Sequence, residues 1–135
     1  MDKVFVDACV LLDIFNEDKN FCDWSIQTLN TLTKTHQLVI NPIIFTEVSL
    51  NFDSCEELSK VLARLNIEIL DIPLQAAFHV SRVFKQYKKN NGDKKSPMPD
   101  FYIGAHAQFL GTAIVTRDTA RFKTYYCDVE LITPH

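Results

Sequence analysis

The chain has 135 residues, of which 47% are hydrophobic and 23% are charged, the balance of an ordinary soluble domain. No apolar run approaches the roughly 18 residues that a membrane span requires, and Asp7 and Asp13 interrupt the first apolar stretch, which argues against an export signal. The net charge of −3 excludes a uniformly basic nucleic-acid coat. From the chain length and the absence of a membrane span or export signal, we expect a single cytoplasmic domain spanning residues 1–135.

Hydrophobic periodicity and breaker residues divide the first half of the chain into short strands and helices. Ser54 and Glu57 form a capping-box pattern that predicts a helix start at residue 55. We expect, in chain order, a strand at 3–6, helices at 8–15 and 21–35, a strand at 38–40, and helices at 43–51 and 55–65.

The second half of the chain continues the alternation. We expect a strand at 67–72, a helix at 74–89, a flexible connection at 90–99, a helix at 100–110, a strand at 113–116, a helical turn at 119–122 and a strand at 129–132. Strands separated by helices predict a three-layer α/β/α sandwich around a mostly parallel sheet of four to five strands. Such sheets bind ligands beyond the carboxyl ends of their strands.

Two acids follow expected strands directly. Asp7 comes after the strand at 3–6, and Asp118 lies just past the strand at 113–116. Carboxyl ends of parallel strands meet at one edge of the sheet, so both side chains are expected there. Either residue alone could equally be a helix N-cap, a common role for aspartate.

Two further acids lie on expected helices. Glu47 shares an apolar face with Ile43 and Ile44, where a carboxylate is costly unless it is paired or binds a cation; a buried salt bridge is the alternative. Asp100 begins a helix and shares a face with Ile103 and Gly104, although it too could be an N-cap. Gly104 would let that helix approach its neighbours closely.

Four carboxylates in one crevice repel one another unless a divalent cation offsets their charge. Oxygen ligands suit Mg²⁺ or Mn²⁺ rather than Zn²⁺. The chemistry that such a site serves best is phosphodiester hydrolysis. Whether one or two cations take part stays open.

A basic window precedes Asp100. It could contact RNA phosphates, receive an acidic partner segment, or form a solvated face. We add Arg117 to these RNA-contacting candidates, which are Arg82, Lys85, Lys88, Lys89, Lys94 and Lys95. Asp13 is expected to be a solvated acid, and His79 and His106 are expected to be surface or packing residues rather than catalysts.

The motifs around the four acids resemble those of the PIN-domain family. The resemblance rests on V-F-V-D-A-C-V-L-L-D at residues 4–13, F-T-E-V at 45–48, P-D-F-Y-I-G-A-H-A at 99–107 and A-I-V-T-R-D-T-A-R-F at 113–122. It implies that Asp7, Glu47, Asp100 and Asp118 bind the metal and that the hydroxyl of Thr116 supports it. Many members place Asn, Ser or Thr where this chain has Cys9, so a supporting contact could be missing or moved.

The resemblance implies a metal-dependent endoribonuclease similar to VapC toxins, with an antitoxin partner and a homodimeric state. A catalytically weak PIN-like module that binds RNA or a protein is the alternative that the Cys9 departure leaves open. A phosphotransferase or receiver domain is disfavoured: the former would have a second Asp at position 9, and the latter a Lys after a late strand, where this chain has Thr116 and Arg117.

Overall fold

The computed structural model describes residues 1–90 and 98–134. Its five strands form one parallel sheet in the order β3-β2-β1-β4-β5. The strands are β1 (Asp2–Val6), β2 (His36–Ile40), β3 (Ile67–Ile69), β4 (Ala113–Val115) and β5 (Leu131–Ile132). The expected parallel sheet is therefore confirmed.

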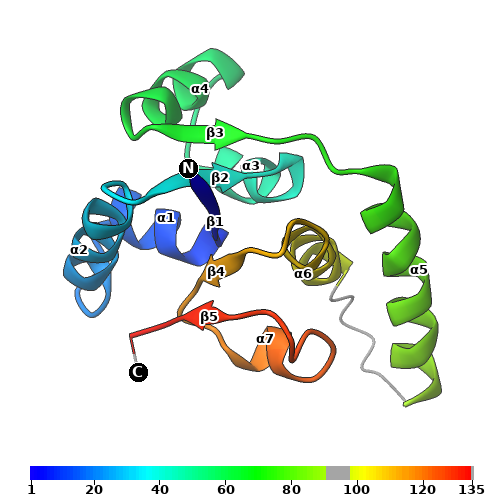
Figure 1. Ribbon diagram of the computed structural model, residues 1–135. Helices are drawn as coiled ribbons and strands as arrows, with labels where there is room; N and C mark the ends of the chain where they lie inside the picture. The colour runs from blue at the N-terminus through cyan, green and yellow to red at the C-terminus, as the bar shows by residue number, and fades with distance from the viewer. Residues whose placement is uncertain (91–97, 135) are drawn as a thin grey trace.

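Helices cover both faces of this sheet. They are α1 (Ala8–Phe15), α2 (Cys22–Leu32), α3 (Pro42–Ser49), α4 (Cys55–Arg64), α5 (Leu74–Lys89), α6 (Met98–Leu110) and α7 (Ala120–Lys123). The chain adds β2 and β3 on one side of β1, and then β4 and β5 on the other side of β1. Because parallel strands are joined by right-handed crossovers, the helices that connect the first set of strands and those that connect the second set lie on opposite faces of the sheet. Figure 1 shows α1 and α2 on one side of the strands and α5, α6 and α7 on the other. The three-layer sandwich is confirmed.

The central strand β1 explains why the first apolar run is continuous. Val4, Phe5 and Val6 are all buried, as expected for a parallel strand covered on both faces. The register pairs Val6 with Val115 of β4. The residues that follow these two strands therefore emerge beside each other at the carboxyl edge.

Several element ends differ from the sequence-based expectation. Strand β3 stops at Ile69 because its register with β2 ends there, the last link being the hydrogen bond from the Leu70 N–H to the carbonyl of Ile40. Strand β5 begins only at Leu131, since the Val129 N–H bonds the carbonyl of Tyr126 and closes a turn. The expected connection at 90–99 lies mostly outside the described residues, and α6 already begins at Met98.

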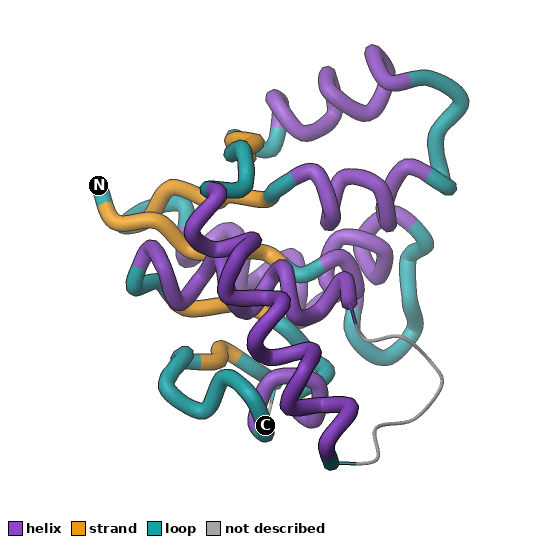
Figure 2. The backbone as a smooth tube through the Cα atoms, turned by 90° about the vertical axis from the view of Figure 1, so that its right-hand side faces the viewer, coloured by secondary structure: helices purple, strands orange, loops and turns teal. Residues whose placement is uncertain are grey.

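Helix α6 packs closely against its surroundings through a glycine. A Cβ added to Gly104 would come within 2.4 Å of the Tyr126 ring, and the hydroxyl of Tyr126 donates a hydrogen bond to the carbonyl of Phe101 at 2.9 Å. The close approach expected for Gly104 is confirmed. Figure 2, viewed from the right-hand side of Figure 1, shows α5 crossing the face turned to the viewer, and α5 packs along α6.

Candidate active site

The carboxylate of Asp7 is completely buried at the carboxyl end of β1. Its Oδ1 accepts a hydrogen bond from the Ala8 N–H at 2.8 Å, which makes Asp7 the N-cap of α1. Its Oδ2 accepts a hydrogen bond from the hydroxyl of Thr116 at 2.8 Å. Asp7 therefore caps a helix and also joins β1 to the end of β4, so the two roles considered from the sequence do not exclude each other.

Thr116 connects Asp7 to Asp118. While its hydroxyl donates to Asp7, the same oxygen accepts a hydrogen bond from the Asp118 N–H at 3.1 Å. Thr119, not Asp118, is the N-cap of α7, so the N-cap interpretation of Asp118 is wrong. The carboxyl edge thus brings Asp7, Thr116 and the backbone of Asp118 into one hydrogen-bonded group.

Cys9 joins the same group through its thiol. Its Sγ donates a hydrogen bond to Asp7 Oδ2 at 3.5 Å and lies 3.6 Å from Thr116 Oγ1. Burial, and then the charge of Asp7, raises the pKa of Cys9 to about 11, so the thiol keeps its proton near neutral pH and can act as a donor. The contact that we expected to be missing or moved is present, with sulfur in place of a smaller donor.

Asp100 is a nearly buried residue in the first turn of α6. It is the third residue of a helix that begins at Met98, so the N-cap alternative is wrong here too. Helix α6 leads directly into β4 and runs back along the sheet; its 13 residues extend about 20 Å. This topology places Asp100 at the carboxyl edge, where the positive end of the helix dipole favours an acid.

Glu47 lies on α3, which is separated from the end of β2 by one residue, Asn41, and so starts at the same edge. The side chain is half-buried between the buried Ile44 and Val48, and its Oε1 has almost no solvent exposure. An acid on an apolar helix face is what the sequence predicted.

The side chains around Asp7 do not form a closed metal cage. Among residues 1–90 and 98–134, no group of three or more His, Cys, Asp or Glu side chains is arranged so that it could hold a metal ion. A carboxylate has about four lone-pair positions, and at Asp7 the Ala8 N–H, the Thr116 hydroxyl and the Cys9 thiol occupy three of them. The oxygen donors suit a hard cation, and Asp7 offers it about one position.

His106 is a buried histidine that contacts Asn41, the residue between β2 and α3. His106 is 1% exposed, its ring lies 4.8 Å from that of Phe5, and its Nδ1 lies 3.2 Å from Asn41 Nδ2. Asn41 Oδ1 accepts from Ile43 N and Ile44 N as the N-cap of α3, so its Nδ2 is a donor and His106 Nδ1 an acceptor. Burial lowers the pKa of His106. The interpretation of His106 as a packing residue agrees with this environment.

Asp13 was expected to be a solvated acid, and this is wrong. Its side chain is 5% exposed, and its two oxygens accept hydrogen bonds from Arg117 Nε at 2.6 Å and Nη2 at 3.2 Å. The Arg117 guanidinium also lies 4.9 Å from the centre of the Phe21 ring. The hydrogen bond that Arg117 donates to Asp13 raises the pKa of Arg117. Sequence reasoning missed this pair because its members are 104 residues apart and no local pattern links them.

The basic residues of α5 are exposed, as a nucleic-acid contact requires. Arg82 stacks over Phe78 and Lys88 over Phe84, while Lys85 and Lys89 extend into solvent; Lys94 and Lys95 lie outside the described residues. The ring of Tyr87 lies 5.6 Å from that of Phe101, the residue after Asp100. The basic end of α5 is therefore beside the Asp100 end of α6.

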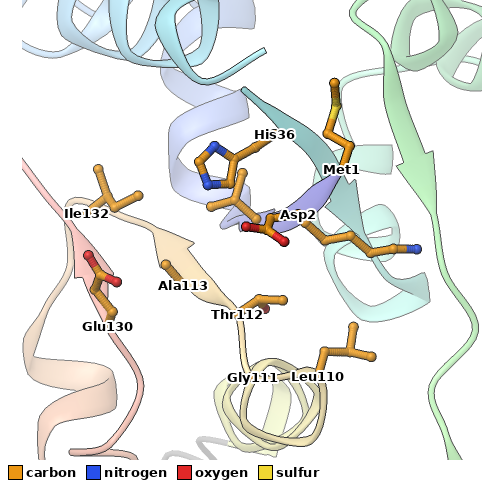
Figure 3. Close-up of a pocket in the computed structure, with 11 residues that line it drawn as sticks. Met1, Asp2, His36, Leu110, Gly111, Thr112, Ala113, Glu130 and Ile132 are labelled. Carbon is orange, nitrogen blue, oxygen red and sulfur yellow. The ribbon is translucent and has the colours of Figure 1, made fainter. Parts of the chain in front are cut away.

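A pocket of about 560 Å³ lies at the opposite, amino-terminal edge of the sheet. Asp2, His36 and Glu130 are among its lining residues, shown in Figure 3 with Gly111 and Thr112 from the turn before β4. None of the four predicted metal ligands lines it. The acidic edge is thus defined by hydrogen bonding and topology rather than by this pocket.

The model of the family described as the PIN domain matches residues 4–126, a span that includes all four acids. The chain belongs to the PIN-domain family. No curated protein sequence matches this PIN domain.

Solved structures share the architecture of the PIN domain. A chain of the promoter-DNA-bound VapBC2 complex from Rickettsia felis is 16% identical, with a TM-score of 0.74 and coverage of 98% of this chain and 99% of that chain. A chain of a toxin-antitoxin complex from Klebsiella pneumoniae is 22% identical, with a TM-score of 0.71 and 98% coverage of both chains. VapBC-1 from nontypeable Haemophilus influenzae gives 17% identity, a TM-score of 0.73 and 97% coverage of both. At these identities the similarity establishes the fold.

Proposed function

We propose that this PIN domain is an endoribonuclease that hydrolyses RNA phosphodiester bonds with Mg²⁺ or Mn²⁺. The observation that carries the proposal is the fully buried Asp7 carboxylate, held by Thr116 where β1 and β4 end together. Asp118 follows β4, and the helices that carry Glu47 and Asp100 begin at this edge, which supports the proposal. These four acids are the proposed metal ligands, and a cation there would supply Lewis-acid chemistry for the hydrolysis.

The chain's own residues would orient this chemistry. The hydroxyl of Thr116 and the Ala8 N–H hold the Asp7 carboxylate from two sides, which would fix its orientation as a ligand. Arg82, Lys85, Lys88 and Lys89 on α5 would bind RNA phosphates, a contact that adds affinity without reading sequence. Lys94 and Lys95 are proposed for the same role on sequence grounds.

Cleavage of RNA with and without Mn²⁺ tests the proposal. Asp7→Asn and Asp100→Asn should each lower the cleavage rate about 100-fold or more, equivalent to about 2.7 kcal/mol in the activation barrier, because each removes a ligand charge. Asp2→Asn, an exposed acid at the opposite edge, is the matched control and should leave the rate unchanged. Full activity in the Asp7 and Asp100 variants would refute the assignment.

A catalytically weak module that binds RNA or a protein remains the second candidate. The observation favouring it is that the described side chains form no group arranged to hold a metal. Thermal unfolding during a Mn²⁺ titration separates the two candidates, because a cation that binds only the folded state raises Tm with its concentration. A constant Tm, together with RNA binding but no cleavage, would favour the module.

The partner of this PIN domain is proposed from its structural neighbours. These neighbours are chains of VapBC and toxin-antitoxin complexes, so we propose that this chain is the toxin of such a pair and that it forms a homodimer. Within the described residues, no helix combines the length and apolar character needed to cross a membrane. We propose a cytoplasmic location, where an RNA substrate and an antitoxin would both be present.

A further inference from the structure

Arg117 lies between two residues of the proposed active site and points away from both. Thr116, before it, bonds Asp7, and Asp118, after it, is a proposed metal ligand. The Arg117 side chain instead reaches α1, where its Nε and Nη2 hold both oxygens of Asp13. A two-point bond of this kind fixes direction as well as distance.

The residue before Arg117 contacts the same helix. The hydroxyl of Thr116 donates to Asp7, the N-cap of α1, and lies 3.6 Å from the sulfur of Cys9 in the first turn of that helix. The guanidinium is also covered by the ring of Phe21, between α1 and α2. The turn after β4 is therefore anchored to α1 through the side chains of two successive residues, Thr116 and Arg117.

The two partners of this ion pair differ in burial. The Asp13 side chain is 5% exposed, whereas that of Arg117 is 35% exposed. A buried carboxylate needs nearly all its hydrogen-bonding positions filled, so Asp13 cannot release Arg117 to solvent without a large cost. The ion pair of Lys3 with Glu68, by contrast, is exposed on both sides and has little such constraint.

We propose that Asp13 and Arg117 are positioning residues that hold the turn Thr116-Arg117-Asp118 in the geometry needed for Thr116 to orient Asp7 and for Asp118 to reach the cation. The inference rests on the proposed function for its catalytic part. It also replaces our sequence-based suggestion that Arg117 contacts RNA, since the guanidinium that would bind phosphate is engaged by Asp13.

The test uses the whole chain carrying Asp13→Asn, Arg117→Lys or, as a matched control, Glu68→Gln from the exposed ion pair. Arg117→Lys keeps a positive charge beside Asp13 but cannot form the two-point bond, and it covers the case in which Asp13→Asn folds poorly. We expect both site variants to weaken Mn²⁺ binding, measured from the electron paramagnetic resonance signal of free Mn²⁺, and to lower kcat, each by about tenfold or more. KM for RNA should change little, and Glu68→Gln should match the wild type.

Hydrogen–deuterium exchange adds a measurement that needs neither metal nor substrate. The Asp118 amide, which donates to Thr116, should exchange faster in both site variants, while the amides of α5 keep their wild-type rates. Wild-type exchange of the Asp118 amide, or wild-type Mn²⁺ affinity and kcat in variants with a lowered Tm, would reduce the pair to a structural bridge and overturn the proposal. If the wild type neither binds Mn²⁺ nor cleaves RNA, the proposed function fails, and the exchange result alone decides whether the pair holds the turn.

Discussion

At Cys9, sulfur replaces the oxygen or nitrogen donor that the family resemblance implies, and the contact with Asp7 is lengthened rather than lost. Its thiol occupies the position at which the family resemblance implies an amide or a hydroxyl, and it still reaches Asp7 Oδ2 at 3.5 Å. Sulfur is a weaker and longer-range donor than oxygen. We infer that Asp7 relies mainly on Thr116, at 2.8 Å, and only secondarily on Cys9.

We expect Cys9→Ala to lower kcat about 3- to 10-fold, because the loss of one hydrogen bond is worth about 0.5–1.5 kcal/mol. Cys9→Ser, which restores a hydroxyl donor, should be at least as active as the wild type. Steady-state RNA cleavage measures both, and Cys55→Ser, an exposed cysteine on α4, is the control. Equal rates for Cys9→Ala and the wild type would show that the thiol plays no part in holding Asp7.

At the scale of elements, α6 determines how close Asp100 can come to the strand ends, and Gly104 determines how close α6 can lie to Tyr126. The ring of Tyr126 occupies the space of the missing Cβ and is itself 1% exposed. It has no room to move aside, since its hydroxyl is bonded to the Phe101 carbonyl. The helix position is therefore fixed by contact rather than by helix propensity.

Gly104→Ala should lower the free energy of unfolding by about 1–3 kcal/mol, in spite of a gain of about 1 kcal/mol in helix propensity. Urea denaturation measures the change. Gln108→Ala, at an exposed position of the same helix, is the control and should be neutral or slightly stabilising. A Gly104→Ala variant as stable as the wild type would mean that α6 and Tyr126 can separate at little cost.

The sequence predicted most elements because their signals are local. The apolar run of β1, the capping box at Ser54 and Glu57, and the strand ends that place Asp7 and Thr116 together all depend on neighbouring residues. The start of α6 was misplaced because Pro97 and Pro99 suggested a loop, whereas Pro99 lies in the first turn, where its missing N–H costs nothing.

What the sequence could not predict is the pairing of distant side chains. Asp13 and Arg117 are separated by 104 residues, and an acid on a short helix has the same local pattern whether it is solvated or buried. Only the fold decides between these outcomes. The side-chain arrangement of the four acids is equally a tertiary property, which their positions at strand ends and on helices do not determine.

For the whole molecule, the burial of His106 couples stability to pH. Its pKa is lowered by burial, so the unfolded chain, with an ordinary histidine pKa of about 6.5, binds a proton more readily than the folded chain. The contribution that the buried, neutral His106 makes to the free energy of unfolding is complete above the ordinary histidine pKa. It is lost as the pH falls through the lower pKa of the folded state. Protonation would also place an N–H of His106 against the amide of Asn41.

Urea unfolding between pH 7.5 and pH 5 should therefore show a declining free energy of unfolding in the wild type and a shallower decline in His106→Gln, which does not titrate. The other histidines are common to both proteins, so the difference between the two curves isolates His106. Parallel curves for the wild type and His106→Gln would show that folding does not perturb this imidazole.

The order of strands in the sheet has a consequence for protein synthesis. Strand β1 is made first, yet the hydroxyl that holds Asp7 comes 109 residues later, and β4, which pairs with β1, comes immediately before it. Contacts so distant along the chain form slowly. A nascent chain that ends before residue 116 lacks both Thr116 and Asp118, so a ribosome translating this message would not be exposed to the assembled site of the proposed nuclease until most of the chain has been made.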